Sequence, residues 1–219
     1  MTAASLVSYR SKDARPRVDQ LTLARRGRRL QYVTILWNSL EGLIAVAAGL
    51  LAGSISLTGF GVDSFIEVTS GVAVLWRLLA DDTDRREHRE RLALRIVAVA
   101  FLMLALYVAV ESTRDLWSRS VPRASPLGMA LACASLLVMP LLSRAKRQVG
   151  RAMSSRALRA DARQTDFCAY LSAILLAGLA FNALFGWWWA DPVAALVMVP
   201  IIANEGVEGL RGDPCDCID

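Results

Sequence analysis

Two acidic residues in the middle of a long apolar run are the residues of this chain best suited to bind a cation. Asp63 and Glu67 lie four residues apart in the segment 53–67, GSISLTGFGVDSFIE. On a helix this spacing places both carboxylates on one face, about one turn apart. An ionised acid inside a bilayer is costly, so the pair requires compensation. A bound cation would supply it, as would an arginine partner or a water-filled gap between helices.

A second polar stripe opens a later apolar run, residues 157–172, ALRADARQTDFCAYLS. Asp161, Gln164, Thr165 and Cys168 recur there at three- and four-residue steps, which places them on one helical face. The wet end of a membrane helix would explain such a stripe. If this face instead meets the two acids, then carboxylate, thiolate and amide groups would form a shell suited to a divalent transition metal.

Long apolar runs would have to position these residues. Six runs have roughly the length of a membrane-spanning helix, at about 32–51, 55–79, 92–110, 127–142, 161–184 and 190–203. They predict an all-α membrane protein with six transmembrane helices. The charged segments 80–91, 111–125 and 143–160 are expected to be loops, and Pro140 is expected to kink or end the fourth helix.

The composition of the whole chain fits that architecture. Of its 219 residues 55% are hydrophobic and 21% are charged, and the mean hydropathy is +0.40, as in a polytopic membrane protein with its charges confined to loops. One histidine and four cysteines are too few for a disulfide framework or a zinc-finger array. The net charge of +5 comes largely from arginines beside the apolar runs, so it indicates membrane topology rather than nucleic-acid binding.

The charge of the connecting segments predicts the orientation. Lys and Arg number eight in residues 1–31, four in 80–91 and six in 143–160, against three in 111–125 and none in the two other connections. By the positive-inside rule both termini are cytoplasmic. The chain is thus expected to comprise a basic cytoplasmic arm (1–31), a six-helix transmembrane domain (32–208) and a short cytoplasmic tail (209–219).

Three segments together resemble the cation diffusion facilitators, a family of divalent metal efflux proteins. SISLTGFGVDSFIE resembles the family's second helix, ALRADA the start of its fifth and ADPVAALVMVPII its sixth, and the resemblance covers about residues 32–208. It implies a secondary transporter, with no enzymatic activity and no cofactor, that moves a divalent metal out of the cytoplasm in exchange for protons. The expected location is a bacterial plasma membrane, and assembly as a homodimer is left open.

The fifth helix departs from the family pattern. Family members usually continue ADxxHxxxD, and an ungapped match of Asp161 puts Gln164 at the His position and Cys168 at the last Asp position. The resemblance therefore implies a metal site of Asp63, Glu67, Cys168, Gln164 and Asp161. Zinc is the first candidate metal, and cobalt, iron, cadmium or manganese are the others. The family's cytoplasmic C-terminal domain has no counterpart here, so a short branch of the family is expected.

Two other functions fit the same residues: a non-transporting membrane scaffold that uses the acids to hold helices together, and a passive cation pore.

Asn38 and Glu41, three residues apart in the first run, could line a cavity or pack helices. Cys215 and Cys217 near the C-terminus could bind a soft metal, although a disordered end is the simpler interpretation.

Overall fold

Six α-helices make up the part of the chain that the computed structural model describes. The backbone is described for residues 3–79 and 84–211, and the side chains for 22–76, 95, 98–155 and 158–211. The helices are α1 (Ala3–Ala52), α2 (Ile55–Leu79), α3 (Asp84–Ser118), α4 (Pro126–Ala152), α5 (Arg156–Phe185) and α6 (Ala190–Arg211). No strand occurs in these described ranges, so the all-α prediction is confirmed.

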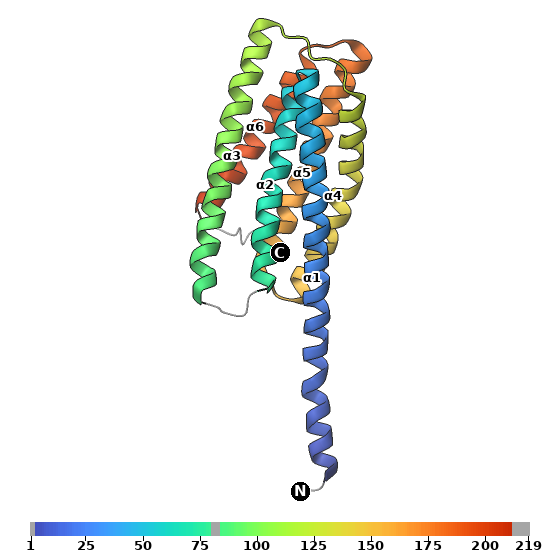
Figure 1. Cartoon of the computed structure of the whole chain (residues 1–219), viewed down its shortest axis with the longest axis vertical. Coiled ribbons are helices and arrows are strands. Elements are labelled where there is room, and N and C mark those ends of the chain that lie inside the picture. Colours follow the sequence, from blue (N-terminus) through green and yellow to red (C-terminus); the bar gives the residue numbers. More distant parts are fainter. Residues whose placement is uncertain (1–2, 80–83, 212–219) are drawn as a thin grey trace.

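The helices run side by side in one bundle, from which the N-terminal part of α1 extends (Figure 1). The closest helix pairs are α1 with α2, α4 with α5, and α3 with α6. The α1–α2, α3–α4 and α5–α6 connections lie at one end of the bundle, and α6 ends toward the opposite end, from which α1 extends (Figure 1). The first and last helices therefore have their outer termini on one side of the bundle. That this side is cytoplasmic stays a prediction.

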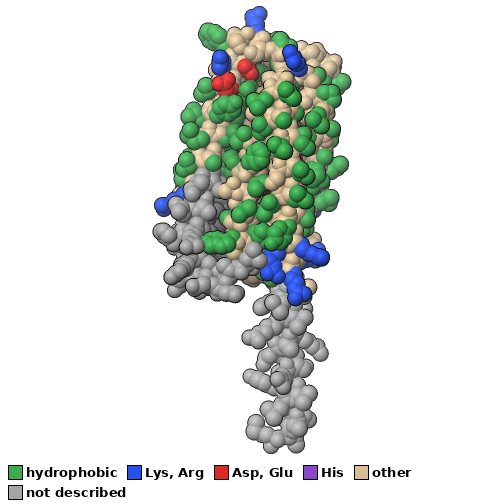
Figure 2. All heavy atoms as spheres, viewed as in Figure 1, with side chains coloured by type: hydrophobic (Ala, Val, Ile, Leu, Met, Phe, Trp, Pro, Cys, Tyr) green, Lys and Arg blue, Asp and Glu red, His purple; other side chains and the backbone are tan. Residues whose placement is uncertain are grey.

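A broad apolar surface surrounds the bundle, as expected of a protein in a bilayer. Figure 2 shows hydrophobic side chains over most of the visible face, with Lys and Arg gathered toward its ends. Among the described residues, four stretches are long and apolar enough to span a membrane: Thr22–Ala52, Pro126–Ala152, Leu158–Phe185 and Ala190–Arg211. The chain is thus a multi-pass membrane protein. Membrane spans were also predicted at α2 and α3, and these two stay predictions. α2 carries two acids and several Ser and Thr residues.

The predicted loop at 143–160 is wrong. α4 continues to Ala152 and α5 begins at Arg156, so a tight turn separates two helices there. The Arg, Ala, Lys and Gln of this segment are good helix formers, and charge alone does not end a helix. Ser155 Oγ accepts a hydrogen bond from the backbone N–H of Leu158 at 3.4 Å, which caps the start of α5.

Other helices are also longer than predicted. α3 takes in residues 84–91 and 111–118, which were expected to be loop. α4 continues past Pro140, so the proline does not end it. The start of α4 is capped by Ser125, whose Oγ accepts a hydrogen bond from Gly128 N at 3.1 Å.

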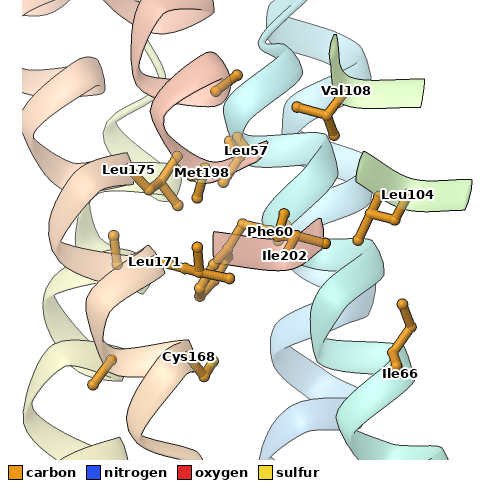
Figure 3. Packing of buried hydrophobic residues seen from close by; sticks show 14 of the residues in the cluster. Leu57, Phe60, Ile66, Leu104, Val108, Cys168, Leu171, Leu175, Met198 and Ile202 are labelled. Atoms are coloured by element: carbon orange, nitrogen blue, oxygen red, sulfur yellow. The ribbon is translucent and has the colours of Figure 1, made fainter. Parts of the chain in front are cut away.

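The core of the bundle is apolar toward one end of the molecule. This is the end that carries the α1–α2, α3–α4 and α5–α6 connections. Figure 3 shows Leu57 and Phe60 of α2 meeting Leu171 and Leu175 of α5 and Met198 of α6. All five side chains are almost completely buried. This layer fills the centre of the bundle between the polar groups described below and that end of the molecule.

Two close contacts fix α2 in this core. A Cβ added to Gly61 would lie 2.7 Å from the backbone N of Val46, so only glycine allows α1 and α2 to approach so closely here. At the start of α2, the Asp191 carboxylate of α6 accepts hydrogen bonds from Ile55 N at 3.1 Å, from Ser54 Oγ at 2.6 Å and from Ser56 Oγ. An acid at a helix N-terminus is favourable. α2 is therefore held by α1 along its length and by α6 at its start.

Candidate metal centre

The two acids of α2 are both buried, and they face different neighbours. Asp63 is 6% exposed and Glu67 is 1% exposed. Asp63 lines a small pocket formed with α3, α5 and α6. Glu67, one turn further along, accepts a hydrogen bond from Thr165 of α5. The pair thus joins two adjoining polar groups inside the bundle.

The pocket beside Asp63 is lined by three side chains with oxygen atoms that could bind a metal. Gln164 of α5 and Glu205 of α6 line it together with Asp63. The remainder of its wall is apolar: Phe101, Phe167, Leu171, Ile201 and Ile202. Asp63 forms no hydrogen bond or ion pair within the described structure, and Gln164 Nε2 is buried without a partner. Two carboxylates and an amide in one pocket are groups that a divalent cation can accept as ligands.

Glu67 belongs to a hydrogen-bonded chain that ends on a buried lysine. Thr165 Oγ1 donates to Glu67 Oε1 at 2.6 Å and accepts from Lys146 Nζ of α4 at 2.8 Å. The same ammonium forms an ion pair with Asp161 Oδ2 at 2.8 Å and lies 3.9 Å from Glu67 Oε1. Gln31 of α1 donates a further hydrogen bond to Asp161 Oδ2 at 2.6 Å. Four helices therefore meet at this polar group.

Charge in this interior is unbalanced toward the negative. Lys146 is completely buried, and it is the only Lys or Arg among the buried residues of the described chain. Four buried carboxylates lie in the same region, those of Glu41, Asp63, Glu67 and Asp161. A buried charge without a partner is strongly unfavourable, so the acids that the single lysine leaves uncompensated must either hold a proton or have another cation beside them.

Asn38 and Glu41 of α1 point into the same interior. Glu41 is 1% exposed and accepts a hydrogen bond from Ser64 Oγ at 3.2 Å through Oε2. Its Oε1, both polar atoms of Asn38 and Oε2 of Glu67 are buried without hydrogen-bond partners. Buried polar atoms are nearly always paired, so these three oxygens and one amide nitrogen mark a place where a ligand or water is expected. Both residues therefore line the polar interior rather than an apolar helix contact.

Cys168 lies one turn beyond Gln164 on α5. Its thiol faces the Glu67 carboxylate and is 1% exposed. It also packs in the apolar cluster with Leu171 (Figure 3). The position suits a thiolate ligand beside Glu67, and it equally suits a small buried packing residue.

The five predicted site residues are thus distributed over two adjoining groups. Asp63 and Gln164 share the pocket, Glu67 and Asp161 share Lys146, and Cys168 faces Glu67. Within the described residues, no three His, Cys, Asp or Glu side chains converge closely enough to hold an ion as they stand. Binding a metal between them would require Glu67 or Asp63 to move.

Sequence reasoning missed Lys146 and Glu205. Lys146 was placed in a charged loop, yet it continues the buried face of α4 through Met139, Leu142, Ser143 and Val149. A three- and four-residue repeat extended past the apolar run would have found it. Glu205 carried no comparable signal, because its approach to Asp63 depends on how α6 packs against α2.

Comparison with known proteins gives a consistent set of relatives. Residues 32–211 match the cation efflux transmembrane domain family. Transmembrane protein 163 of Xenopus laevis is 25% identical over 180 residues, 82% of this chain and 64% of the relative. An uncharacterized transporter of Methanocaldococcus jannaschii is 26% identical over 179 residues, covering 78% and 63% of the two chains. The magnetosome protein MamB of Magnetospira sp. is 26% identical over 167 residues, covering 73% and 57%. The chain therefore spans less than two thirds of each relative's length.

Proposed function

Because this chain belongs to the cation efflux family, we propose that it is a secondary transporter that exports a divalent metal cation. The observation that carries the proposal is the excess of buried acid over buried base. Glu41, Asp63, Glu67 and Asp161 face one lysine in the interior of a membrane bundle. Acids are rare at such depth and generally belong to the path of an ion.

The proposed metal ligands are Asp63 and Glu67, with Cys168, Gln164 and Asp161 completing the shell. Asp63 has no protein partner, and Glu67 Oε2 and Asp161 Oδ1 are each unpartnered, so every acid of the site has an oxygen available to a metal. Cys168 would add a thiolate. A mixed oxygen and sulfur shell favours zinc, with cadmium, cobalt, iron and manganese as further candidates.

Glu205 is proposed to assist at the mouth of the site. It lies near the C-terminal end of α6 and lines the same pocket as Asp63. A carboxylate there would raise the local concentration of cations before they reach Asp63. The positive-inside rule predicts that this end of the bundle is cytoplasmic, and the pocket would then be the cytoplasmic entrance.

A buried apolar layer, on the side of Asp63 away from Glu67, favours alternating access over a passive pore. The apolar layer of Leu57, Phe60, Leu175 and Met198 is buried and offers no ligand to an ion. An ion leaving in that direction would need helices to move apart. A scaffold function is less well supported, because it gives no reason for carboxylate oxygens to be buried without partners.

Exchange for protons is part of the proposal. Carboxylates and a thiol must lose their protons to coordinate a metal, so binding releases protons and protonation releases the metal. The test is uptake into proteoliposomes that contain a metal indicator or a pH indicator. We expect zinc influx to be accompanied by proton efflux and to be faster when the lumen is acidic. Metal influx that is insensitive to a pH gradient would refute the exchange, and absence of influx for every divalent ion would refute transport.

A further inference from the structure

Lys146 is completely buried in the acidic interior, where it forms an ion pair with Asp161 and a hydrogen bond to Thr165. On the basis of the proposed function, we propose that Lys146 is a tethered cation that occupies the metal-free centre and must release Glu67 before Glu67 can bind a metal. Lys146 would then be a positioning residue that sets how tightly the metal is held and how readily it leaves.

The geometry distinguishes a fixed partner of Lys146 from an exchangeable one. Asp161 is the fixed partner, since its Oδ2 lies 2.8 Å from Nζ and is held in place by Gln31. Glu67 is the exchangeable partner. Its Oε1 is 3.9 Å from the ammonium, beyond direct hydrogen bonding, and is reached through the Thr165 hydroxyl. Only a rotation of Glu67 or Thr165 is needed to break this link.

Charge makes the lysine and the metal competitors for Glu67. Two cations close to one carboxylate repel each other, and the repulsion is strong where water is excluded. Glu67 turned toward Asp63 and Cys168 would serve a metal, whereas Glu67 turned toward Thr165 serves Lys146. The link through Thr165 therefore lowers the affinity for metal and, by recapturing Glu67, speeds metal release.

If Lys146 had only a structural role, weakening its contacts would change the metal affinity in the opposite direction. The Lys146–Asp161 ion pair also joins α4 to α5, and breaking a buried pair commonly destabilises a protein. If Lys146 only held these helices, weakening its contacts would loosen the site and lower the affinity for metal. The direction of the change in affinity separates the two roles.

Thr165 allows a test in which both members of the Lys146–Asp161 ion pair are retained. Thr165→Val removes the hydroxyl between Lys146 and Glu67 and keeps the shape of the side chain, while Thr165→Ser keeps the hydroxyl as a matched control. Zinc binding would be measured by competition with a fluorescent chelator, on purified protein at fixed pH, and uptake would be measured in proteoliposomes. We expect Thr165→Val to bind zinc about three- to tenfold more tightly, with KM and kcat both reduced, and Thr165→Ser to resemble the original protein.

Lys146→Met and Lys146→Arg provide a second comparison. Met removes the charge and is expected to shift zinc binding in the same direction as Thr165→Val, whereas Arg retains a cation beside Glu67 and is expected to bind zinc more weakly than the Met variant does. If Lys146→Met fails to fold, the Thr165 pair still decides. If Thr165→Val binds zinc as tightly as the original protein, or more weakly, the proposed role of Lys146 is wrong. If the original protein neither binds nor transports any divalent ion, the proposed transport function is wrong instead.

Discussion

Lys146 of α4 and Asp161 of α5 form a buried ion pair, with Nζ 2.8 Å from Oδ2 and 3.9 Å from Oε1 of Glu67 of α2. The pair joins α4 to α5 within a polar interior that holds four buried carboxyl groups and one buried lysine. Thr165 extends it to Glu67, and Asp63 continues the acidic group into the pocket. The arrangement gives each of these residues a testable role.

Cys168 is predicted to set the metal preference. A thiolate is a softer ligand than a carboxylate, so Cys168→Ser should reduce zinc and cadmium transport, and Cys168→Asp should restore transport with the preference moved toward harder ions such as manganese. Uptake of zinc, cadmium and manganese by the two variants would be compared under identical conditions. Unchanged rates and unchanged preference in Cys168→Ser would mean that the side chain only packs against its neighbours.

Glu205 is predicted to attract metal into the pocket. Glu205→Gln removes one carboxylate from the pocket that Asp63 also lines and should raise KM about two- to fivefold with little change in kcat, because the Glu205 side chain is only partly buried. Glu208→Gln is the matched control, since Glu208 lies one turn further along α6 and does not line the pocket. An equal effect of both variants would indicate a general surface-charge effect rather than a role in the pocket.

The orientation of the bundle is open to chemical labelling. Single cysteines would be placed at Ala152, after the basic part of α4, and at Ser118, at the end of α3, in a background without the four native cysteines. Both positions are exposed. An impermeant thiol reagent applied to intact cells should label Ser118→Cys and spare Ala152→Cys. The reverse pattern would place the pocket entrance outside the cell.

Much of the fold follows from local sequence pattern. The apolar runs predicted the order of the helices and the short connection between α1 and α2. The spacing of Asp63 and Glu67 predicted that they share one helical face, and the structure buries both. The helix ends were not predictable from polarity, because Arg- and Lys-rich segments such as the end of α4 form helix as readily as loop. A helix can therefore continue into water beyond the last residue of its apolar run, as α4 does.

The partners of the buried acids could not be predicted from the same pattern. Lys146 and Asp161 lie in separate helices, and only the packing of α4 against α5 brings them together. Glu205 reaches the pocket of Asp63 in the same way, through α6. Sequence spacing reports which residues share a helical face, whereas pairing across helices depends on register and rotation between them.

The central claim is that Asp63 and Glu67 bind the transported metal. Asp63→Asn and Glu67→Gln keep the shape of each side chain and remove its charge, so the bundle should fold while the site loses a ligand. Asp115→Asn, the same change near the end of α3 opposite the pocket entrance, is the control.

The most direct measurement is zinc uptake into proteoliposomes that contain equal amounts of folded protein, as judged by size-exclusion chromatography. Asp63→Asn and Glu67→Gln are each expected to reduce uptake by about a hundredfold or more, and Asp115→Asn is expected to transport as the parent protein does. Uptake at the parental rate by both Asp63→Asn and Glu67→Gln would contradict a metal site at these two acids.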